Sequence, residues 1–333
     1  MTKSKNSGIS KTIIIRIVFV VILSTGIHGQ TLEKYTISRF AGIGSGVRGY
    51  SGDGGQAVSA QLNEPSDVAE DAKGAIFIVD EGNHLIRQID TNGRIQTIAG
   101  TGEQGFSGDD GPAIRAQFLF PRAIELDQEG NILVSDTMNH RIRLINKSGI
   151  ITTIAGTGKG GFNGDRQLAT QCDLNWPSGI AVDKTGTIYF SDTQNHLIRK
   201  IIGDGRISTV AGTPGKHGYR GDGGPATQAL LWAPWGIAID AANSIMGIAL
   251  DSRGNLYVAD RENNRIRMID SMGIIRTVAG NGKQADGKKG NLATETGLNF
   301  PHGVAVDSKD QVYIADTFNH RIKRIGTDGR IEF

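Results

Sequence analysis

Residues 191–201 read Ser-Asp-Thr-Gln-Asn-His-Leu-Ile-Arg-Lys-Ile, and the chain carries five copies of this pattern. The other copies begin at Val79, Ser135, Ala259 and Ala315. Neighbouring copies lie 56 residues apart, except for the third and fourth copies, which lie 68 residues apart. A fixed period of this length indicates a repeat architecture in which each unit packs against the next.

Each copy predicts four short strands. In the third copy, residues 188–191 and 197–201 are apolar, β-prone runs, and the Asp192–Asn195 segment between them favours a turn. Gly179–Asp183 predicts a strand before this hairpin, and Arg206–Ala211 predicts one after it. Four-stranded antiparallel sheets arranged radially make a β-propeller. We therefore predict an all-β fold with five blade cores, at residues 65–90, 121–146, 177–202, 234–270 and 301–326. The alternative is an incomplete six-bladed ring.

The pattern resembles the NHL repeat, which is named for an Asn-His-Leu signature. Asn83-His84-Leu85 and Asn195-His196-Leu197 carry these three residues. With the Thr-Ile-Ala-Gly and Tyr-Ser-Gly-Asp-Gly-Gly segments added, the longer unit looks like the NHL propeller of teneurins and of many secreted proteins. The resemblance covers Ile37 to the C-terminus and implies the propeller fold, but it implies no particular activity.

Histidine, aspartate and arginine recur once per blade at equivalent positions. Histidines that repeat in this way lie a blade width or more apart, so they cannot share one metal ion, whose nitrogen ligands lie within about 2.1 Å of it. We interpret the repeated residues as structural, forming hydrogen bonds and ion pairs between blades. The positions are Asp80, His84, Arg87, Asp136, His140, Arg143, Asp192, His196, Arg199, Asp260, Arg267, Asp316 and His320.

A patterned linker precedes each inner strand. Small residues recur eight and five positions before its closing proline, which predicts that the linker packs against the sheets. Cys172, the single cysteine, takes one of these positions and is predicted to be a buried small hydrophobe. The linkers also repeat a Gly-Asp motif, as in Gly52-Asp53-Gly54-Gly55. Calcium needs six to eight oxygens and each loop offers one or two carboxylates, so we interpret the motif as a turn.

The N-terminal segment Met1–Gly29 predicts a secretory signal peptide. Four basic residues precede or flank the apolar run 17–23, and small residues that permit cleavage follow it. Arg16 interrupts the apolar run, so a membrane-spanning helix is not expected, and a short signal anchor is the alternative. Residues 30–333 then form the propeller domain, which we expect to be secreted, monomeric and not inserted in a membrane.

The charge pattern does not favour nucleic acid or an anionic membrane as partner. The chain of 333 residues has a formal net charge of +2. Removal of the signal segment leaves 32 Lys and Arg against 34 Asp and Glu, with both signs interspersed. We therefore expect an extracellular protein or glycan as partner, and no cofactor.

Five inner-strand residues depart from their repeat. They are Asp67, Glu70, Arg122, Glu125 and His302. The resemblance includes an amidating lyase that binds metal with inner-strand histidines, but His302 is the one residue here that matches. No Ser-His-Asp, phosphate-loop or Cys-x-x-Cys spacing is present in the sequence. We expect a non-enzymatic interaction module without a catalytic or metal site; the alternative is a propeller enzyme, a lyase or esterase-like hydrolase, acting at the central axis.

Two irregularities concern how the ring is completed. Ile37–Gly42 matches an outer strand but has no blade before it, and we expect it to close the ring by pairing with Ile322–Ile325. In the fourth blade, Gly236–Asp240 is nearly duplicated by Gly247–Asp251. We expect the second copy to form the inner strand because it keeps the regular spacing to Tyr257. An error of gene prediction is the alternative.

Asn146-Lys147-Ser148 is the one N-glycosylation sequon of the chain. It falls in a turn whose equivalents, Asp90–Gly93 and Asp270–Gly273, are polar and close with glycine. The turn is therefore expected on the surface, and Asn146 is predicted to be glycosylated if the source is a eukaryote. The alternative is that Asn146 is simply a turn former in place of aspartate.

Overall fold

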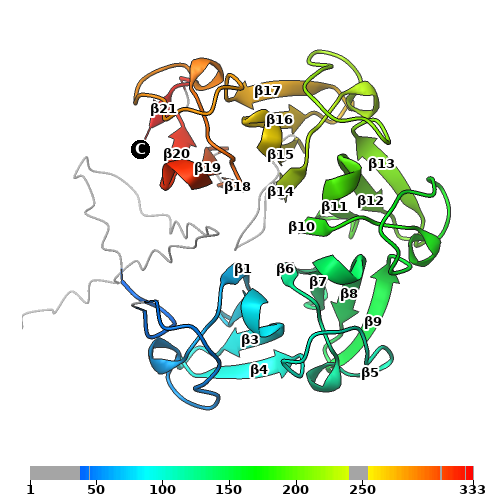
Figure 1. Ribbon diagram of the computed structural model, residues 1–333, viewed down its shortest axis with the longest axis vertical. Coiled ribbons are helices and arrows are strands. Elements are labelled where there is room, and N and C mark those ends of the chain that lie inside the picture. Colours follow the sequence, from blue (N-terminus) through cyan, green and yellow to red (C-terminus); the bar gives the residue numbers. More distant parts are fainter. Residues whose placement is uncertain (1–37, 45, 240–253, 308–309, 327, 333) are drawn as a thin grey trace, which may run out of the picture.

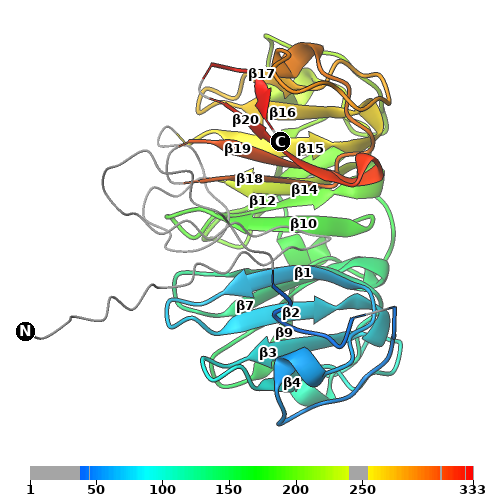
Figure 2. The same ribbon diagram turned by 90° about the vertical axis from the view of Figure 1, so that its left-hand side faces the viewer.

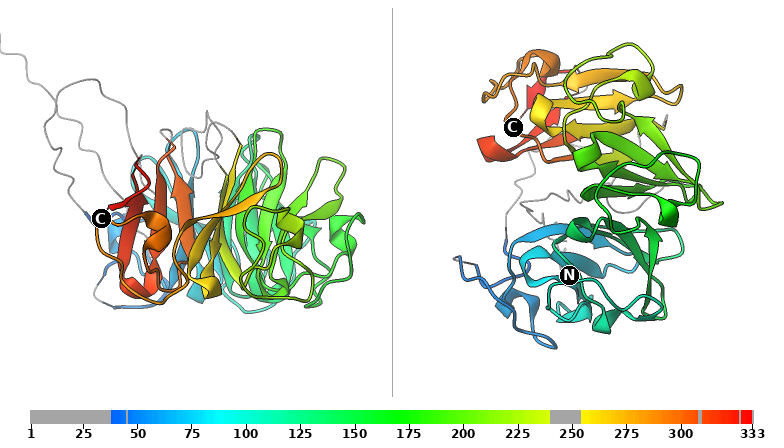
Figure 3. Two further views of the ribbon diagram at one scale, coloured as in Figure 1. Left: turned by 90° about the horizontal axis from the view of Figure 1, so that it is seen from above. Right: turned by 45° about the vertical axis from the view of Figure 1, so that its right-hand side comes forward.

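The computed structural model of the protein describes residues 38–44, 46–239, 254–307, 310–326 and 328–332. Over these ranges the regular structure consists of β-strands and short 3-10 turns, without an α-helix. The strands form five antiparallel sheets that follow one another around a central axis (Figure 1). Figure 3 shows the strands running between the two faces of the disc. The predicted five-bladed β-propeller is thus confirmed.

Each blade is built from four consecutive strands, of which the first lies nearest the axis. Blade 1 contains β1 (Pro65–Glu70), β2 (Ile76–Asp80), β3 (Leu85–Ile89) and β4 (Ile95–Ala99). Blade 2 contains β6 (Pro121–Leu126), β7 (Ile132–Asp136), β8 (Arg141–Ile145) and β9 (Ile150–Ala155), with the short β5 (Gly111–Pro112) outside β9. Blade 3 contains β10 (Pro177–Val182), β11 (Ile188–Asp192), β12 (Leu197–Ile201) and β13 (Ile207–Ala211). Blade 4 contains β14 (Pro234–Ile239), β15 (Leu256–Asp260), β16 (Arg265–Ile269) and β17 (Ile275–Ala279). Blade 5 contains β18 (Gly303–Val306), β19 (Val312–Asp316), β20 (Arg321–Ile325) and β21 (Ile331–Glu332).

Two 3-10 turns accompany each blade. One set connects the second and third strands: η2 (Glu81–Asn83), η4 (Thr137–Asn139), η6 (Thr193–Asn195), η8 (Arg261–Asn263) and η10 (Thr317–Asn319). The residue after each of these turns has a positive φ, such as 60° at His196, which histidine and asparagine tolerate better than most residues. The other set lies in the linkers: η1 (Ala57–Ser59), η3 (Ala113–Arg115), η5 (Ala169–Gln171), η7 (Ala226–Gln228) and η9 (Ala293–Glu295).

The hydrophobic core lies between the blades. Ala181 and Ile198 of blade 3 pack in one cluster with Ile237 and Val258 of blade 4. The linker before blade 4 adds Ala226, which is almost fully buried, so the predicted packing of the linkers is confirmed. Cys172 occupies the equivalent layer of blade 3 and is buried as predicted. Each sheet from blade 1 to blade 4 therefore buries the face that it turns to the next blade, which is how repeat proteins are stabilised.

The predicted closing strand is wrong. The edge of β20 is paired with β21, through Arg324 opposite Glu332 and Ile325 opposite Ile331. The described part of the N-terminal segment attaches to blade 1 instead, where the amide of Gly42 donates to the Ala57 carbonyl at 2.9 Å. Gly100 makes the same bond to Ala113 in blade 2. The segment therefore keeps the contacts that every outer strand makes with the linker after it.

The seam between blades 5 and 1 differs from the other four. Each inner strand contacts the inner strand of the next blade: β1 contacts β6, β6 contacts β10, β10 contacts β14, and β14 contacts β18. Figure 1 shows β18 and β1 standing apart, and Figure 2 looks onto this seam, with β10 and β14 of the far blades visible between them. The Thr317 hydroxyl of blade 5 donates within its own blade, to the Ala315 carbonyl, whereas the equivalent Thr137 reaches the next blade.

The expectation for the duplicated segment is also wrong. The first copy forms β14, which places Ile237 opposite Val258 and Ile239 opposite Leu256. The physical reason is the linker before it, because the amide of Trp232 donates to the Asp260 carboxylate at 2.8 Å and so fixes where β14 begins. The second copy, Gly247–Asp251, lies outside the described residues.

The N-terminal predictions lie outside the described residues. Met1–Gly29 belongs to the undescribed segment, so the signal peptide remains a prediction. Among the residues that the structure does describe, no helix has the length and apolar character needed to cross a membrane.

Candidate functional site

A buried cation holds each blade to its own linker. Arg199 is fully buried and pairs with Asp192 at 3.2 Å and with Asp165 of the Gly-Asp motif at 2.9 Å. Phe162 of the same linker lies beneath the guanidinium, 4.8 Å from its carbon to the ring centroid. The other blades repeat this cluster with Arg87, Arg143, Arg267 and Lys323.

The interpretation of these ion pairs requires a correction. We expected the aspartates and arginines to join neighbouring blades, but each pair lies within one blade and its linker. The Gly-Asp motif is likewise more than a turn, because its carboxylate neutralises the buried arginine. Burial raises the pKa of Asp136, Asp192 and Asp260 to about 6, against the lowering effect of their hydrogen bonds and of the arginine.

The repeated histidines do join neighbouring blades. The Nδ1 atom of His196 accepts a hydrogen bond from the amide of Ala233, at 3.1 Å, in the linker of the next blade. His84 and His140 do the same with Phe120 and Trp176. In the fourth blade, Asn264 offers its side-chain oxygen to Phe300 at 2.9 Å. His320, in blade 5, is exposed and has no such partner among the described residues. Burial lowers the pKa of His84, His140 and His196.

The threonine that makes a second hydrogen bond across the seams is replaced in two blades. Thr193 follows the repeated Asp192, and its hydroxyl donates to the carbonyl of Pro234 in the next blade at 2.8 Å. Thr137 makes the equivalent bond to Pro177. In blades 1 and 4 this threonine is replaced by Glu81 and Arg261. The sequence already contained this signal, because both residues interrupt an Asp-Thr pair that the other three copies share, although the two residues were not among the predicted departures.

Glu81 and Arg261 each contact a residue of the next inner strand that also departs from the repeat. Glu81 pairs with Arg122 at 3.2 Å, and both side chains are less than one-fifth exposed. The Nε of Arg261 donates to the Nε2 of His302 at 2.8 Å. Trp235, between them around the axis, is stacked nearly parallel to His302, with ring centroids 5.2 Å apart. We call these five residues the mouth cluster.

Arg122 extends across the axis. Its guanidinium carbon lies 4.5 Å from the ring centroid of Trp235, although Arg122 belongs to blade 2 and Trp235 to blade 4. Its Nη1 atom is buried and has no hydrogen-bond partner among the described residues. Burial raises the pKa of Glu81, an effect that the charge of Arg122 opposes. The mouth cluster thus links blades 1, 2, 4 and 5 around one opening.

A cavity of about 480 Å³ lies beneath the mouth cluster. This volume is in the range of small-molecule sites. The cavity has polar residues near the starts of the inner strands, and apolar residues further along these strands and on β19 and β20. Its lining includes Ser66, Asp67, Glu81, Arg122, Trp235 and His302, together with Ile180, Ile237, Val304, Ile314 and Ile322. Arg261 stands behind His302 and does not line the cavity.

His302 is held in its neutral form. Burial, with the charges of Arg261 and Arg122, lowers the pKa of His302 to about 4. Since the hydrogen bond from Arg261 occupies Nε2, the proton of the neutral ring resides on Nδ1. His302 therefore presents a donor and not a free lone pair. Of the described residues, no group of three or more histidines, cysteines, aspartates and glutamates is placed to hold a metal ion.

The structure separates the predicted departures into two sets. Arg122 and His302 belong to the mouth cluster, and Asp67 lines the same cavity, where it accepts a hydrogen bond from the amide of Ile124 at 2.9 Å. Glu70 and Glu125 lie towards the other ends of β1 and β6, and neither lines the cavity. The positions of these residues within the repeat therefore did not show which of them line the same cavity.

The predicted glycosylation site is accessible. Asn146 is exposed, and its side-chain oxygen accepts the amides of Ser148 and Ile150 at 2.9 and 3.0 Å. These bonds leave the side-chain nitrogen, where a glycan would attach, without a hydrogen-bond partner among the described residues. Modification of Asn146 remains a prediction.

Comparison with known proteins agrees with the repeats. The NHL repeat family matches residues 247–267 and 298–325, and the Teneurin NHL domain family matches residues 45–107 and 158–220. Human Teneurin-4 is 29% identical over 76% of this chain, and NHL repeat-containing protein 2 of Gallus gallus is 27% identical over 83% of it. The chain spans 10% of the length of Teneurin-4 and 41% of NHL repeat-containing protein 2.

A solved structure shares the fold. An auxiliary nutrient binding protein from Bacteroides ovatus has a TM-score of 0.56 and 18% sequence identity, and the match covers 82% of this chain and 60% of that one. The protein is thus a β-propeller whose sequence matches the NHL repeat and the Teneurin NHL domain. The predicted resemblance is thereby confirmed, and the propeller is similar to the NHL domain of teneurins.

Proposed function

We propose that the protein is a secreted, non-enzymatic interaction module that binds an extracellular protein or glycan through the cavity beneath the mouth cluster. The observation that carries this proposal is the loss of two seam threonines. Glu81 and Arg261 take their places, and both side chains turn towards residues of the next inner strand that also break the repeat. A repeat that gives up structural bonds around one cavity has the pattern of a binding site.

The state of His302 favours binding over catalysis. A general base needs an available lone pair and a pKa near the working pH. The Nε2 lone pair of His302 is already used by Arg261, and its pKa is lowered to about 4. A propeller lyase or esterase would have to break this bond before His302 accepted a proton. Secretion is supported by the predicted signal peptide of residues 1–29.

Binding of the secreted protein to arrays of glycans and of extracellular proteins tests the proposal. Trp235→Ala removes the central ring of the mouth cluster and should weaken binding about tenfold or more. Trp232→Ala is the matched control, because Trp232 is 40% exposed and does not line the cavity. Equal loss in both variants, or no loss in either, would exclude the cavity as the binding site. Stoichiometric metal in the purified protein would favour the enzyme instead.

A further inference from the structure

Arg122 carries a hydrogen-bonding edge that the protein does not use. Its Nε donates to Glu81, at 3.2 Å. Its Nη1 atom is buried without a partner, and its Nη2 atom donates to no described residue. A guanidinium has five N–H donors, and leaving buried donors unpaired is costly. The Nε atoms of Arg87, Arg143 and Arg199 also lack a partner, but these arginines do not line the cavity, whereas Arg122 does. The unused edge of Arg122 therefore favours a ligand that brings oxygen acceptors into the cavity.

The guanidinium is held in place before any ligand arrives. Trp235 and Trp176 both face it, with its central carbon 4.5 and 5.8 Å from their ring centroids. Glu81 fixes the opposite edge. A planar cation fixed by stacking and by one ion pair loses little freedom on binding, which is the condition for tight bidentate recognition.

The charge of the site selects a single carboxylate. The Nη1–Nη2 edge of arginine matches the two oxygens of a carboxylate. The second guanidinium, that of Arg261, is already engaged by His302 and Glu262, so one unused cationic edge remains in the mouth cluster. A dianionic phosphate would meet the carboxylate of Glu81 beside that edge without a second free cation, and like charges repel at such distances.

The remainder of the cavity suits a sugar ring. Ser66 donates its hydroxyl hydrogen to the Arg122 carbonyl, and its oxygen can still accept. His302, whose proton lies on Nδ1, lines the same cavity, as do apolar side chains such as Ile180 and Ile237. A pyranose combines hydroxyl groups at its edge with C–H groups on its faces, so it matches both parts of this lining.

We propose that the cavity binds the terminal acidic sugar of a glycan, a uronic-acid type of residue whose carboxylate pairs with the Nη1–Nη2 edge of Arg122. This inference rests on the proposed binding function and names its ligand class. Glu81 stays on the Nε of Arg122, and its negative charge opposes that of the ligand carboxylate. The sugar hydroxyls meet Ser66 and His302, and the ring packs against the apolar wall.

Calorimetry with small probes tests the ligand class. The secreted full-length product should bind methyl glucuronide about tenfold or more tightly than methyl glucoside, because the two differ at the carboxylate. Glucose 6-phosphate and octanoate should bind more weakly than the glucuronide. Equal binding of glucoside and glucuronide would overturn the role of the carboxylate. Tighter binding of octanoate or of the phosphate would overturn the acidic sugar as the ligand.

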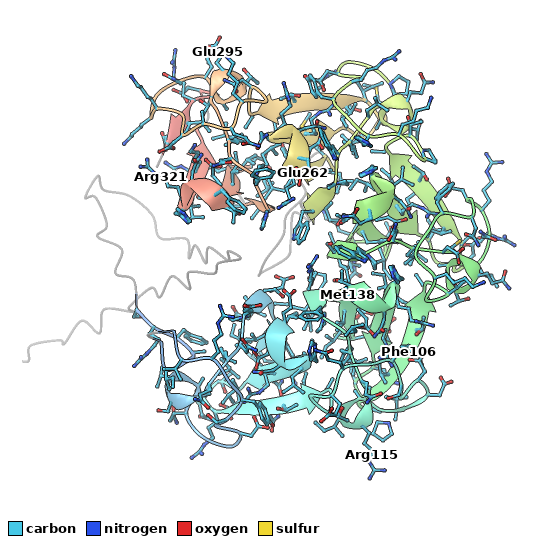
Figure 4. The ribbon with its side chains drawn as sticks, viewed as in Figure 1. Phe106, Arg115, Met138, Glu262, Glu295 and Arg321 are labelled. Carbon is cyan, nitrogen blue, oxygen red and sulfur yellow. The ribbon has the colours of Figure 1, made fainter. Side chains whose placement is uncertain are left out.

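Substitutions locate the site. Arg122→Gln should reduce glucuronide affinity about tenfold or more and remove the preference over glucoside. Arg115→Gln is the matched control, because Arg115 is an exposed arginine at the outer rim of blade 2 (Figure 4). Glu81→Gln removes the competing charge and should tighten glucuronide binding several-fold, which a merely misfolded variant would not do. Unchanged affinity in Arg122→Gln, or weaker binding in Glu81→Gln, would overturn the inference.

The glycan array separates this inference from the proposed function. Wild-type protein that captures acidic glycans and loses them with Arg122→Gln supports both. Capture of neutral glycans or proteins through Trp235 would overturn the acidic sugar and leave the binding function standing. Failure to capture any array ligand, with methyl glucuronide also unbound, would overturn both.

Discussion

Arginines occupy two settings in this protein. In the blade clusters, Arg199 and its equivalents are fully buried, each lies between two aspartates, and the arrangement returns in every blade, with Lys323 replacing arginine in the fifth. In the mouth cluster, Arg122 and Arg261 are about one-fifth exposed, each pairs with a single carboxylate, and neither has an equivalent arginine in other blades. The same side chain therefore lies between two carboxylates where the repeat preserves it and pairs with one carboxylate where the repeat is broken.

The position of the charged groups explains this division. A buried ion pair is stable only if its charge is matched, and the blade clusters match each cation with two carboxylates, backbone carbonyls and a repeated asparagine. Single nitrogen atoms still lack a hydrogen-bond partner among the described residues in both settings, namely the Nε atoms of Arg87, Arg143 and Arg199 and the Nη1 atom of Arg122. Arg122 differs because it pairs with one carboxylate and lines the cavity. Figure 4 shows the side chain of Glu262, which pairs with Arg261, on the inner side of blade 4 near the axis, whereas Arg115 and Glu295 lie at the outer rim.

Removing a blade-cluster arginine should have the largest effect on stability. Arg199→Met leaves Asp192 buried without its cation and should lower the free energy of unfolding by about 3–5 kcal/mol. Denaturant unfolding of the purified protein measures this. Arg206→Gln, at an exposed ion pair with Asp204, is the control and should change stability by less than about 0.5 kcal/mol. Similar losses in both variants would mean that burial does not distinguish the two settings.

The seam histidine should have an intermediate effect. His196→Ala leaves the amide of Ala233 without its acceptor and should destabilise the protein by roughly 1–3 kcal/mol. His196→Asn should recover most of the loss, because Asn264 performs the same role in blade 4. Thermal unfolding of both variants provides the measurement. Loss of a bound metal from His196→Ala would contradict the structural role.

Restoring the repeat at the mouth should change stability little. Arg261→Thr supplies a hydroxyl where Thr193 donates to the proline carbonyl of the next blade, and should alter the free energy of unfolding by no more than about 1 kcal/mol. It also removes the hydrogen bond and the charge that lower the pKa of His302, so that pKa should rise, as followed by NMR titration. A loss of stability as large as that of Arg199→Met would show that Arg261 is structural.

The contribution of His196 to stability should also depend on pH, because its imidazole can be protonated, and this effect should be smaller. Burial, followed by the charge of His217, lowers the pKa of His196 below its ordinary value of 6.5. Between these two values the unfolded chain binds more protons, so the stability from His196 is present above pH 6.5 and is lost as the pH falls below it. The stability advantage of wild type over His196→Asn should therefore shrink from about pH 7.5 to about pH 5. An advantage that grows would contradict the sign.

Glycosylation of Asn146 should affect neither the blade clusters nor the mouth cluster. Mass spectrometry before and after a glycan-releasing amidase should show a mass loss for protein secreted from eukaryotic cells. Asn146→Asp is the control, because Asp90 and Asp270 form the equivalent turns with the same backbone bonds. It should abolish the mass loss without a measurable change in stability. An unchanged mass in the wild type would show that Asn146 is an unmodified turn former.

Sequence periodicity was sufficient for the blades. The 56-residue spacing, the alternation of short apolar runs and turns, and the small residues of the linkers predicted four strands per blade and a packed linker, and the structure has both. These features are local, because strand, turn and linker follow one another within a single period. The departures Arg122 and His302 were likewise visible as breaks in the repeat.

Only the tertiary structure determined which residues and segments contact each other. The packing of linkers onto sheets decides three features. Asp192 pairs with Arg199 of its own blade, the first of the two duplicated segments forms β14, and residues 38–43 attach to blade 1. The mouth cluster depends on it most, since Arg122 and Trp235 lie far apart in the sequence and in non-adjacent blades. The period defines equivalent positions along the chain, whereas the curvature of the ring determines which of them meet at the axis.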